Sequence, residues 1–255
     1  MKLRSKVATT KDGTFLVLEN DGIGGNLLRG ESWEPHFAQT LAALQLSGTT
    51  VLDVGANIGA NTVPLANAVG ETGRVIAFEP QRITFQQLCG TVILNGFSNV
   101  ITLQKAVGAE LGSTQLESID YFAPHVNVGN AGLGCGGDTV DMITIDSLGL
   151  NDISFIKLDI QGSETAAIRG ARQTIEITRP FLFLEIEEAQ LVQRGSSAQE
   201  LVNEIISLGY DLLHINNDYP VDFVAIPHER RGSIAALQKM LAFPTQLFQS
   251  PNVRS

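Results

Sequence analysis

Two carboxylates and two glycines between residues 50 and 80 have the types and the spacing of a site for a nucleotide-type cofactor. Asp53 lies just before the turn from Gly55 to Gly59, and Glu79 ends the next apolar segment. This pattern predicts strand, turn, helix and strand, which places both acids at the carboxyl edge of a parallel sheet. Because the glycines lack Cβ atoms, a ligand can approach the turn closely, and Glu79 is placed to bind the two hydroxyls of a ribose.

The spacing of these glycines separates two classes of cofactor. A dinucleotide-binding turn has the pattern G-x-G-x-x-G, and its helix N-terminus faces a pyrophosphate. This chain has neither that pattern here nor the lysine of a phosphate-binding loop. A carboxylate at Asp53 would repel pyrophosphate and attract a cation such as a sulfonium or an ammonium. The pattern therefore favours S-adenosylmethionine over NAD, and a strand–helix–strand unit whose glycines only serve packing is the alternative.

The composition limits the class of protein. The length of 255 residues fits one large α/β domain, or one domain with a small appendage, and 44% hydrophobic residues allow a sizeable core. A net charge of -10 argues against a broad basic surface for nucleic acid, although a local patch stays open. No apolar run approaches the roughly 20 residues of a membrane span. We therefore expect neither a nucleic-acid nor a membrane partner.

The N-terminus and the cysteines indicate a cytoplasmic protein. The basic start, residues 1–6, is not followed by the apolar region of a signal peptide. The two cysteines, Cys89 and Cys135, form neither a metal cluster nor a disulfide framework, so we expect a reducing compartment and no metal. Cys89 falls in an apolar helical segment and is expected in the core, whereas Cys135 falls in a glycine loop and is expected to be more exposed.

Residues 1–49 are predicted to form a cover that packs on the main domain. The predicted elements are a loose start over 1–13, a strand over 14–18, a glycine-rich loop over 22–31, and a helix capped by Ser32 with Pro35 in its first turn. Trp33, Glu34 and His36 could line the site. A docking helix whose polar residues are solvated is the favoured alternative.

From residue 50 to residue 227, helical and strand patterns alternate, which is typical of an α/β core. Helices are predicted over 83–94, 165–170, 174–178 and 198–208, and strands over 50–54, 74–79, 100–105, 142–148, 153–160, 181–186, 210–215 and 222–226. Asn95 and Gly96 end the first of these helices, so Asn95 is expected to be a cap. The last two strands are expected to pair antiparallel, because their connection is short. Residues 228–255 are predicted to hold a helix over 234–241 and a polar tail.

Residues 109–141 interrupt the alternation. A strand or hairpin is predicted near 113–119, and five of the nine residues from Gly129 to Gly137 are glycine. A glycine-rich insertion of this kind inside a compact domain is often a lid or a binding loop. A disordered surface insertion is the alternative.

Three segments together resemble the FkbM-like family of class I S-adenosylmethionine-dependent methyltransferases. These segments are 53–59 with Thr62, 78–80, and 156–164 with the following Gly170–Ala171 and Arg179–Pro180. The resemblance extends over about residues 50–227. It implies a Rossmann-like α/β fold with a seven-stranded mixed sheet, an antiparallel last strand and helices on both faces.

The resemblance also implies a cofactor and an activity. The cofactor is S-adenosylmethionine, and the activity is methyl transfer to a hydroxyl of a small molecule, a sugar or a natural-product intermediate. The alternatives are N-methylation of a peptide or amide acceptor, and a cofactor-binding protein that has lost transfer activity. The sequence leaves the oligomeric state open, and a homo-oligomer is possible. The residues expected on the cofactor are Asp53, Gly55, Ala56, Asn57, Gly59, Thr62, Glu79, Pro80 and Ala106, where Asn57 and Thr62 could instead only cap the helix.

Asp159 and Glu185 are the candidate catalytic residues, because each follows a central strand at the carboxyl edge of the sheet. A hydroxyl acceptor must lose its proton, and we expect Asp159 as the first choice for the base and Glu185 as the second. Glu164 lies at a helix start, where it could act on the acceptor or only complement the helix dipole. Lys157 is expected to face away from these acids by strand alternation, or to extend its ammonium group toward solvent.

Gln161 departs from the resembling family, which usually has glutamate at this position. The amide keeps the hydrogen-bonding shape of the side chain and loses its charge, which could change the substrate or the activity. Four histidines could act as a base, and each is expected more often to be structural. They are His36, His125, His214 and His228.

Overall fold

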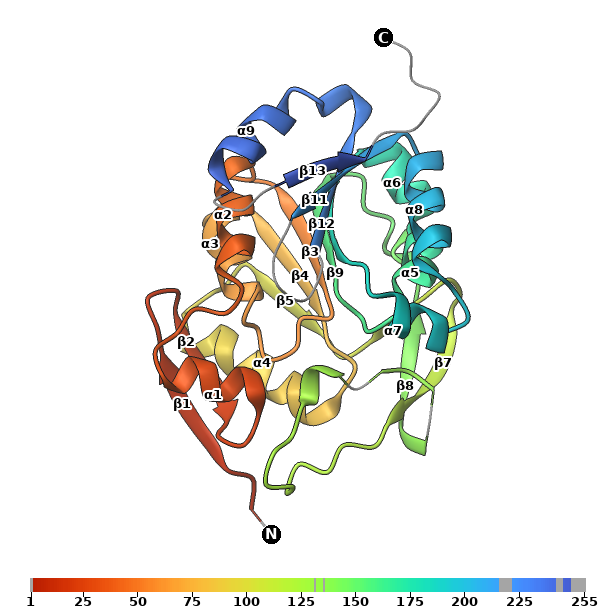
Figure 1. Ribbon diagram of the computed structural model, residues 1–255. Helices are drawn as coiled ribbons and strands as arrows, with labels where there is room; N and C mark the ends of the chain where they lie inside the picture. Colours follow the sequence, from red (N-terminus) through yellow and green to blue (C-terminus); the bar gives the residue numbers. More distant parts are fainter. Residues whose placement is uncertain (1, 131, 135, 216–221, 242–244, 249–255) are drawn as a thin grey trace.

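The computed structural model is built around one mixed β-sheet (Figure 1). It describes residues 2–130, 132–134, 136–215, 222–241 and 245–248. The strands of the sheet are β3 (Thr50–Val54), β4 (Arg74–Phe78), β5 (Val100–Leu103), β9 (Ile153–Leu158), β10 (Phe181–Glu185), β11 (Tyr210–Ile215), β12 (Asp222–Pro227) and β13 (Thr245–Phe248). Their order across the sheet is β13, β11, β12, β10, β9, β3, β4, β5.

Seven of these strands confirm the predicted seven-stranded mixed sheet. β5, β4, β3, β9 and β10 pair parallel, and β12 runs antiparallel to both of its neighbours, β10 and β11. The eighth strand, β13, pairs antiparallel with β11 at the edge of the sheet. It lies in the segment predicted to be a polar tail, where a four-residue strand is too short to give a clear periodic pattern.

Helices cover both faces of the sheet. One layer holds α2 (Pro35–Ala43), α3 (Thr62–Val69), α4 (Arg82–Leu94) and α9 (Ser233–Met240), and the other holds α5 (Glu164–Gly170), α6 (Arg172–Thr178), α7 (Glu188–Gln193) and α8 (Ala198–Ser207). On β9, Phe155 packs on the first layer and Ile156 on the second. Successive strand residues point to opposite faces, so a sheet covered on both sides needs apolar residues at nearly every position.

The N-terminal cover contains more regular structure than predicted. The supposedly loose start forms β1 (Ser5–Thr9), which pairs with β2 (Thr14–Leu18) in an antiparallel hairpin. The supposed glycine loop is α1 (Gly22–Leu28), because the Asp21 carboxylate accepts a hydrogen bond from Gly24 N at 3.0 Å and caps the helix. The prediction of Ser32 as the cap of α2 is wrong, since the helix begins after Glu34.

The hairpin of this cover docks on α4. Asn95, the residue expected to cap that helix, accepts from Thr14 N at 3.0 Å and donates to Thr91 O at 2.8 Å. It is therefore a cap, as predicted, and also holds the hairpin. Cys89 on the same helix is half-buried beside Thr102 and is not part of the core.

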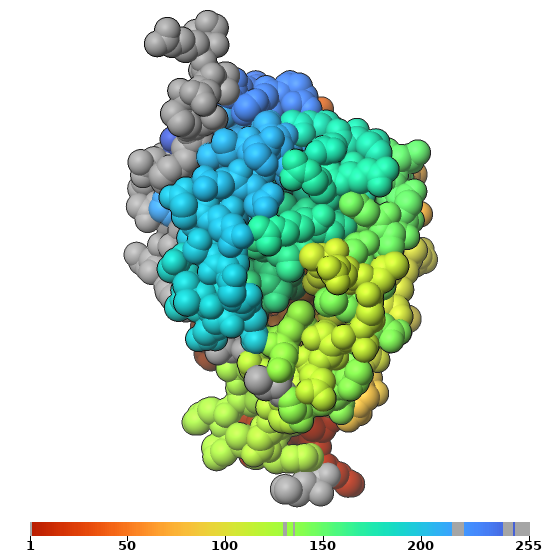
Figure 2. Space-filling view, turned by 90° about the vertical axis from the view of Figure 1, so that its right-hand side faces the viewer, coloured from red at the N-terminus to blue at the C-terminus, as the bar shows by residue number. Residues whose placement is uncertain are grey.

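The insertion forms most of a second, small sheet, whose first strand lies just before it. Its strands are β6 (Ala106–Val107), β7 (Gly112–Glu117) and β8 (Gly136–Ile143), with β8 between the other two, and Val128–Asn130 form a short 3-10 turn. Figure 2 shows this segment, coloured yellow to green, directly below the part of the surface formed by the helices of the second layer. Cys135 lies outside the described residues.

The strand predicted over 142–148 is displaced in the structure. β8 ends at Ile143, and Asp146–Leu148 form a 3-10 turn. The Asp146 carboxylate accepts hydrogen bonds from Gln173 N and Thr174 N at 3.1 and 2.7 Å, so it caps α6. Among the described residues, no helix has the length and apolarity to cross a membrane.

Candidate active site

A cavity of about 320 Å³ opens at the carboxyl ends of β3, β4, β9 and β10. Three parts of the chain line it: Trp33 and Glu34 of the N-terminal cover, the strand ends of the core, and Val128 and Leu133 of the insertion. Its size fits a small ligand or cofactor. The predicted site residues Gly55, Ala56, Asn57, Glu79, Pro80, Ala106, Asp159 and Glu185 all line it.

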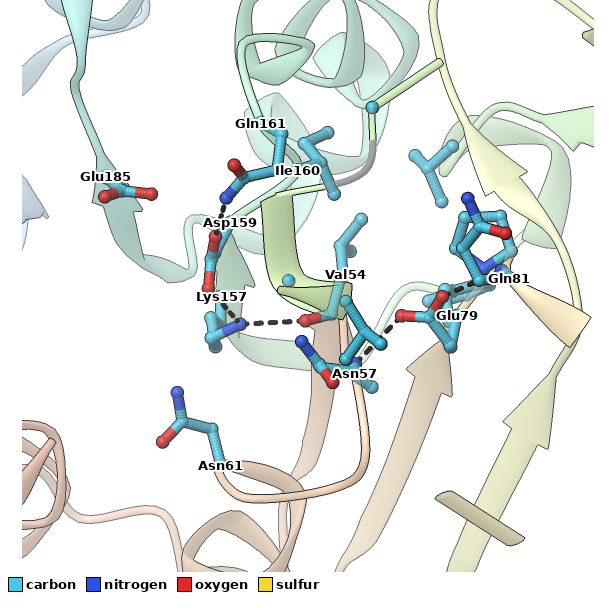
Figure 3. A pocket seen from close by; sticks show the side chains of 18 of the residues that line it. Val54, Asn57, Asn61, Glu79, Gln81, Lys157, Asp159, Ile160, Gln161 and Glu185 are labelled. Carbon is cyan, nitrogen blue, oxygen red and sulfur yellow. Dashed lines mark hydrogen bonds and ion pairs between the residues drawn. The ribbon is translucent and has the colours of Figure 1, made fainter. Parts of the chain in front are cut away.

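Glu79 forms one end of this cavity. Its carboxylate accepts hydrogen bonds from Asn57 N at 3.0 Å and from Gln81 N at 2.8 Å (Figure 3). Asn57 has a φ of 51°, and this left-handed conformation turns its N–H toward the acid. Burial raises the pKa of Glu79 to about 7, although the two N–H groups oppose the shift. A carboxylate has about four acceptor positions, so Glu79 retains capacity for ribose hydroxyls.

Close contact with the residues that follow β9, as well as the neighbouring cavity, requires glycine in the turn after β3. Gly55 has a φ of 81°, and a Cβ atom there would lie 1.9 Å from the backbone oxygen of Asp159. Gly59 faces Leu88 and Thr91 of α4 and does not line the cavity. The Asn57 side chain accepts from Ile58 N at 2.7 Å, so in this structure it caps the turn.

Asp53 and Thr62 lie behind the wall of the cavity. Asp53 is fully buried, and its carboxylate accepts from the Thr62 hydroxyl at 2.6 Å and lies 3.5 Å from Lys157 Nζ. Neither residue lines the cavity. Asp53 therefore supports Lys157 from behind, and its charge does not face the ligand space as the sequence pattern suggested.

Lys157 points toward the acids, so the prediction that it faces away is wrong. Its ammonium lies 3.2 Å from Asp159 and donates to Gly55 O at 3.1 Å. Lys157 is opposite Asp53 in the register of β9 and β3, and two residues before Asp159, so all three side chains share one face. Burial opposes its charge, but Asp159, Asp53 and Glu34 raise the pKa of Lys157 above the ordinary lysine value.

The end of the cavity opposite Glu79 collects carboxyl groups (Figure 3). Asp159 is held by Lys157 and by Gln161, whose amide donates to it at 3.3 Å. Burial, together with the charges of Asp159 and Asp222, raises the pKa of Glu185 to about 9. Glu185 is thus protonated at neutral pH, whereas Asp159 sits beside a cation.

Two residues expected near the chemistry are structural. Glu164 is buried, and its carboxylate accepts from Ile160 N at 2.9 Å and Gly162 N at 3.3 Å, which closes the turn before α5. His36 is buried with its Nε2 2.5 Å from Asp222. Among the described residues, none of the four histidines lines the cavity.

Of the three cover residues expected as possible site residues, Trp33 and Glu34 line the cavity and His36 does not. Asn61, Gln161 and Gln190 also line it and were not predicted to. A backbone signal distinguishes two of them. Four described residues other than glycine have a positive φ, and three of these, Glu34, Asn57 and Gln161, line the cavity. Such conformations collect at functional sites, but they are not visible in a single sequence.

Together, the fold and the cavity define a class I methyltransferase arrangement: a glycine turn after the first parallel strand, an acid after the second, and carboxyl groups over the central strands. A model of the methyltransferase FkbM domain matches residues 53–212. The chain belongs to the FkbM methyltransferase family, and its cofactor is S-adenosylmethionine, as the sequence predicted.

A solved structure shows the same fold. Methyltransferase FkbM from Methylobacillus flagellatus KT is 23% identical with a TM-score of 0.53, over 74% of this chain and 47% of that chain. The chain thus spans about half the length of that relative. Aeropyrum pernix fibrillarin with natively bound S-adenosyl-L-methionine is 12% identical with a TM-score of 0.48, over 88% and 94% of the two chains. No curated protein matches the chain.

We expect Glu79→Ala to weaken the binding of S-adenosylhomocysteine by roughly 1–3 kcal/mol, the usual scale for hydrogen bonds to a charged group. Glu79 lies in the cavity wall, where it is expected to accept hydrogen bonds from the ribose. Glu79→Gln keeps one acceptor oxygen, so it should lose less affinity than the alanine variant. Isothermal titration calorimetry measures both. Unchanged affinity in the alanine variant would remove Glu79 from the cofactor site.

We expect the unliganded protein to lose stability as the pH rises from 5.5 to 7.5. Burial raises the pKa of Glu79 and Glu164 from 4.5 to about 7, and that of Glu34 likewise. In this window the native state holds protons that the unfolded state has released, so the unfolding free energy falls by about 1.4 kcal/mol per pH unit for each such proton.

Urea unfolding at the two pH values tests this expectation. Glu164→Gln keeps the oxygen that accepts from Ile160 N and removes the titration, so the fall with pH should be shallower in this variant. A stability that increases from pH 5.5 to 7.5 in the parent protein would contradict the assignment.

Proposed function

We propose that this protein transfers the methyl group of S-adenosylmethionine to a hydroxyl oxygen of a small molecule, a sugar or a natural-product intermediate. The observation that carries the proposal is the position of Asp159 at the end of the cavity opposite Glu79, beside buried Lys157 (Figure 3). One end of the cavity then holds the nucleoside and the other holds the group to be methylated.

The residues present fit this cofactor. Glu79 has acceptor capacity for a ribose, and Ala106 and Pro80 offer apolar wall beside it. Asn61 lines the cavity, and its Oδ1 is buried and has no hydrogen-bond partner among the described residues, so an acceptor beside the cavity is unused. When bound, S-adenosylmethionine supplies an electrophilic methyl group on a sulfonium.

The chain then has two tasks, to align the acceptor oxygen and to take its proton. Alignment can account for up to about 7–11 kcal/mol of a barrier in favourable intramolecular cases. Asp159 is the proposed base, because it faces the cavity and its side chain is 30% exposed. Glu185, with its pKa raised to about 9, carries a proton at neutral pH and would act as a hydrogen-bond donor to the acceptor.

The role of Gln161 bears on the alternative that transfer has been lost. Its amide donates to Asp159 at 3.3 Å, where a second carboxylate would repel that residue. The substitution thus retains a support for Asp159, which favours a working enzyme over a binding protein.

Mass spectrometry with methyl-deuterated S-adenosylmethionine tests the proposal on a panel of sugars, polyols, hydroxylated lipids, amines and peptides. A deuterated methyl ether on a hydroxyl is the expected product. Methylation of nitrogen alone would support N-methylation. Cofactor binding without a methylated product across the panel would favour the binding protein, and binding of NAD instead of S-adenosylhomocysteine would favour a dehydrogenase.

A further inference from the structure

The end of the cavity away from Glu79 has an unusual balance of charge. Three carboxyl groups line it, those of Glu34, Asp159 and Glu185. The cation at this end, Lys157, already lies against Asp53 and Asp159 and donates to Gly55 O. The other lysine of the described lining, Lys105, belongs to the Glu79 side and pairs with Asp141 at 2.7 Å. An anion placed at the carboxyl-rich end would meet negative charge without a free cation.

Glu34 reaches this end from the N-terminal cover, outside the residues that the family model matches. Its φ of 44° is uncommon for a residue with a long side chain. The residue is half-buried, and its carboxylate accepts a hydrogen bond from the Asn61 amide at 2.8 Å. The charged and polar groups closest to it are thus Asn61 from the loop before α3, Lys157 and Asp159 from the end of β9, and Asp222 from β12.

Asn61 supplies an independent sign of a ligand. It is 5% exposed and lines the cavity, and Figure 3 shows its amide nitrogen on the side of Lys157 and its amide oxygen turned the other way. Its Nδ2 is used by Glu34, while its Oδ1 has no partner among the described residues. Buried acceptors are nearly always paired, so Asn61 keeps an unused acceptor beside the cavity that it lines.

We propose that Glu34 and Asn61, with Asp159, form an acceptor subsite for a group that donates hydrogen bonds and carries no negative charge. Hydroxyl-rich acceptors and acceptors with an ammonium near the reacting oxygen fit this subsite, whereas those with a phosphate or carboxylate there do not. The inference rests on the proposed function, because that function sets which end of the cavity holds the acceptor. Glu34 is thereby a specificity-determining residue supplied by the cover.

Adenosyl ligands that differ only at the position of the transferred methyl can test the subsite without knowledge of the acceptor. Sinefungin has an amine there, S-adenosylhomocysteine has nothing, and the carboxymethyl analogue of S-adenosylmethionine has a carboxylate. At pH 8 we expect the parent protein to bind sinefungin about 10-fold tighter than S-adenosylhomocysteine, because the ammonium forms charge-assisted hydrogen bonds. The carboxymethyl analogue should bind about 10-fold more weakly than S-adenosylmethionine.

Two variants of Glu34 make the test specific. Glu34→Gln keeps the shape of the side chain, and Glu34→Asn suits the left-handed backbone, so at least one should fold as judged by circular dichroism and thermal melting. Each should reduce the preference for sinefungin to about 3-fold or less, while the affinity for S-adenosylhomocysteine stays within about 2-fold. Glu71→Gln, an exposed change of the same charge at the opposite edge of the sheet, should keep the full preference.

The outcomes separate this inference from the proposed function. Equal binding of the three ligands by the parent protein, or an unchanged preference in a folded Glu34 variant, would overturn the subsite and leave the methyl-transfer proposal standing. Failure of the parent protein to bind any of the adenosyl ligands would overturn the proposed function, and the subsite with it.

Discussion

Replacing Lys157 with methionine should lower the free energy of unfolding by about 3–5 kcal/mol, the usual cost of removing one partner from a buried ion pair. The lysine side chain is 2% exposed, and the facing Asp53 is fully buried. Without the ammonium, Asp53 must either keep an uncompensated charge away from water or take up a proton. Urea unfolding followed by circular dichroism measures the change.

A second substitution shows whether the loss arises from the charge. In the Lys157→Met background, Asp53→Asn removes the unpaired carboxylate and keeps an acceptor for the Thr62 hydroxyl, so it should restore part of the stability. A double variant that is less stable than Lys157→Met, or a single variant that stays within about 1 kcal/mol of the parent, would contradict a buried pair of this importance.

The second large effect concerns the chemical step. Asp159→Asn should reduce the rate of methyl transfer by about 10²–10⁴-fold, the range that general-base groups contribute, because the amide cannot take the proton of the hydroxyl. Cofactor affinity should change little, since Asp159 lies at the end away from Glu79 (Figure 3). Initial rates of S-adenosylhomocysteine formation, measured with the acceptor found by label transfer, report the effect.

Glu185→Gln is the matched control, because Glu185 is the other candidate for the base. With its pKa raised to about 9, this side chain is already neutral near pH 7.5, and glutamine keeps a hydrogen-bond donor there. The rate should therefore fall less than about 10-fold, well short of the loss expected for Asp159→Asn. A larger loss in Glu185→Gln than in Asp159→Asn would exchange the roles of the two residues.

The prediction for Lys157 failed for an identifiable reason. Residues two apart on a strand share a face, so Lys157 and Asp159 had to point the same way. Only the pairing of β9 with β3, however, shows that Asp53 stands opposite the lysine and neutralises it. Asp53, which the sequence pattern places where it could bind a cationic ligand, is thus enclosed. The acids that face the cavity are Glu34, Glu79, Asp159 and Glu185.

The N-terminal cover shows a second limit of prediction from the sequence. Asn95, 81 residues from Thr14, fixes the hairpin on α4, and this docking brings the cover against the core. Glu34 and Trp33 reach the cavity as part of that cover. From the sequence, Glu34 could line the site but a solvated position was favoured, because its side chain meets Asn61 only after the cover has packed.

The sequence by itself determined the alternation of strands and helices, the parallel direction of the core strands, the glycine turn and the acids at the strand ends. These features depend on local periodicity and on the rule that parallel strands end at one edge. The tertiary structure decided which acids face the ligand, which are neutralised, and which distant segments complete the wall. Those properties depend on pairing register and burial, because the charge of a carboxylate is set by the groups that packing brings next to it.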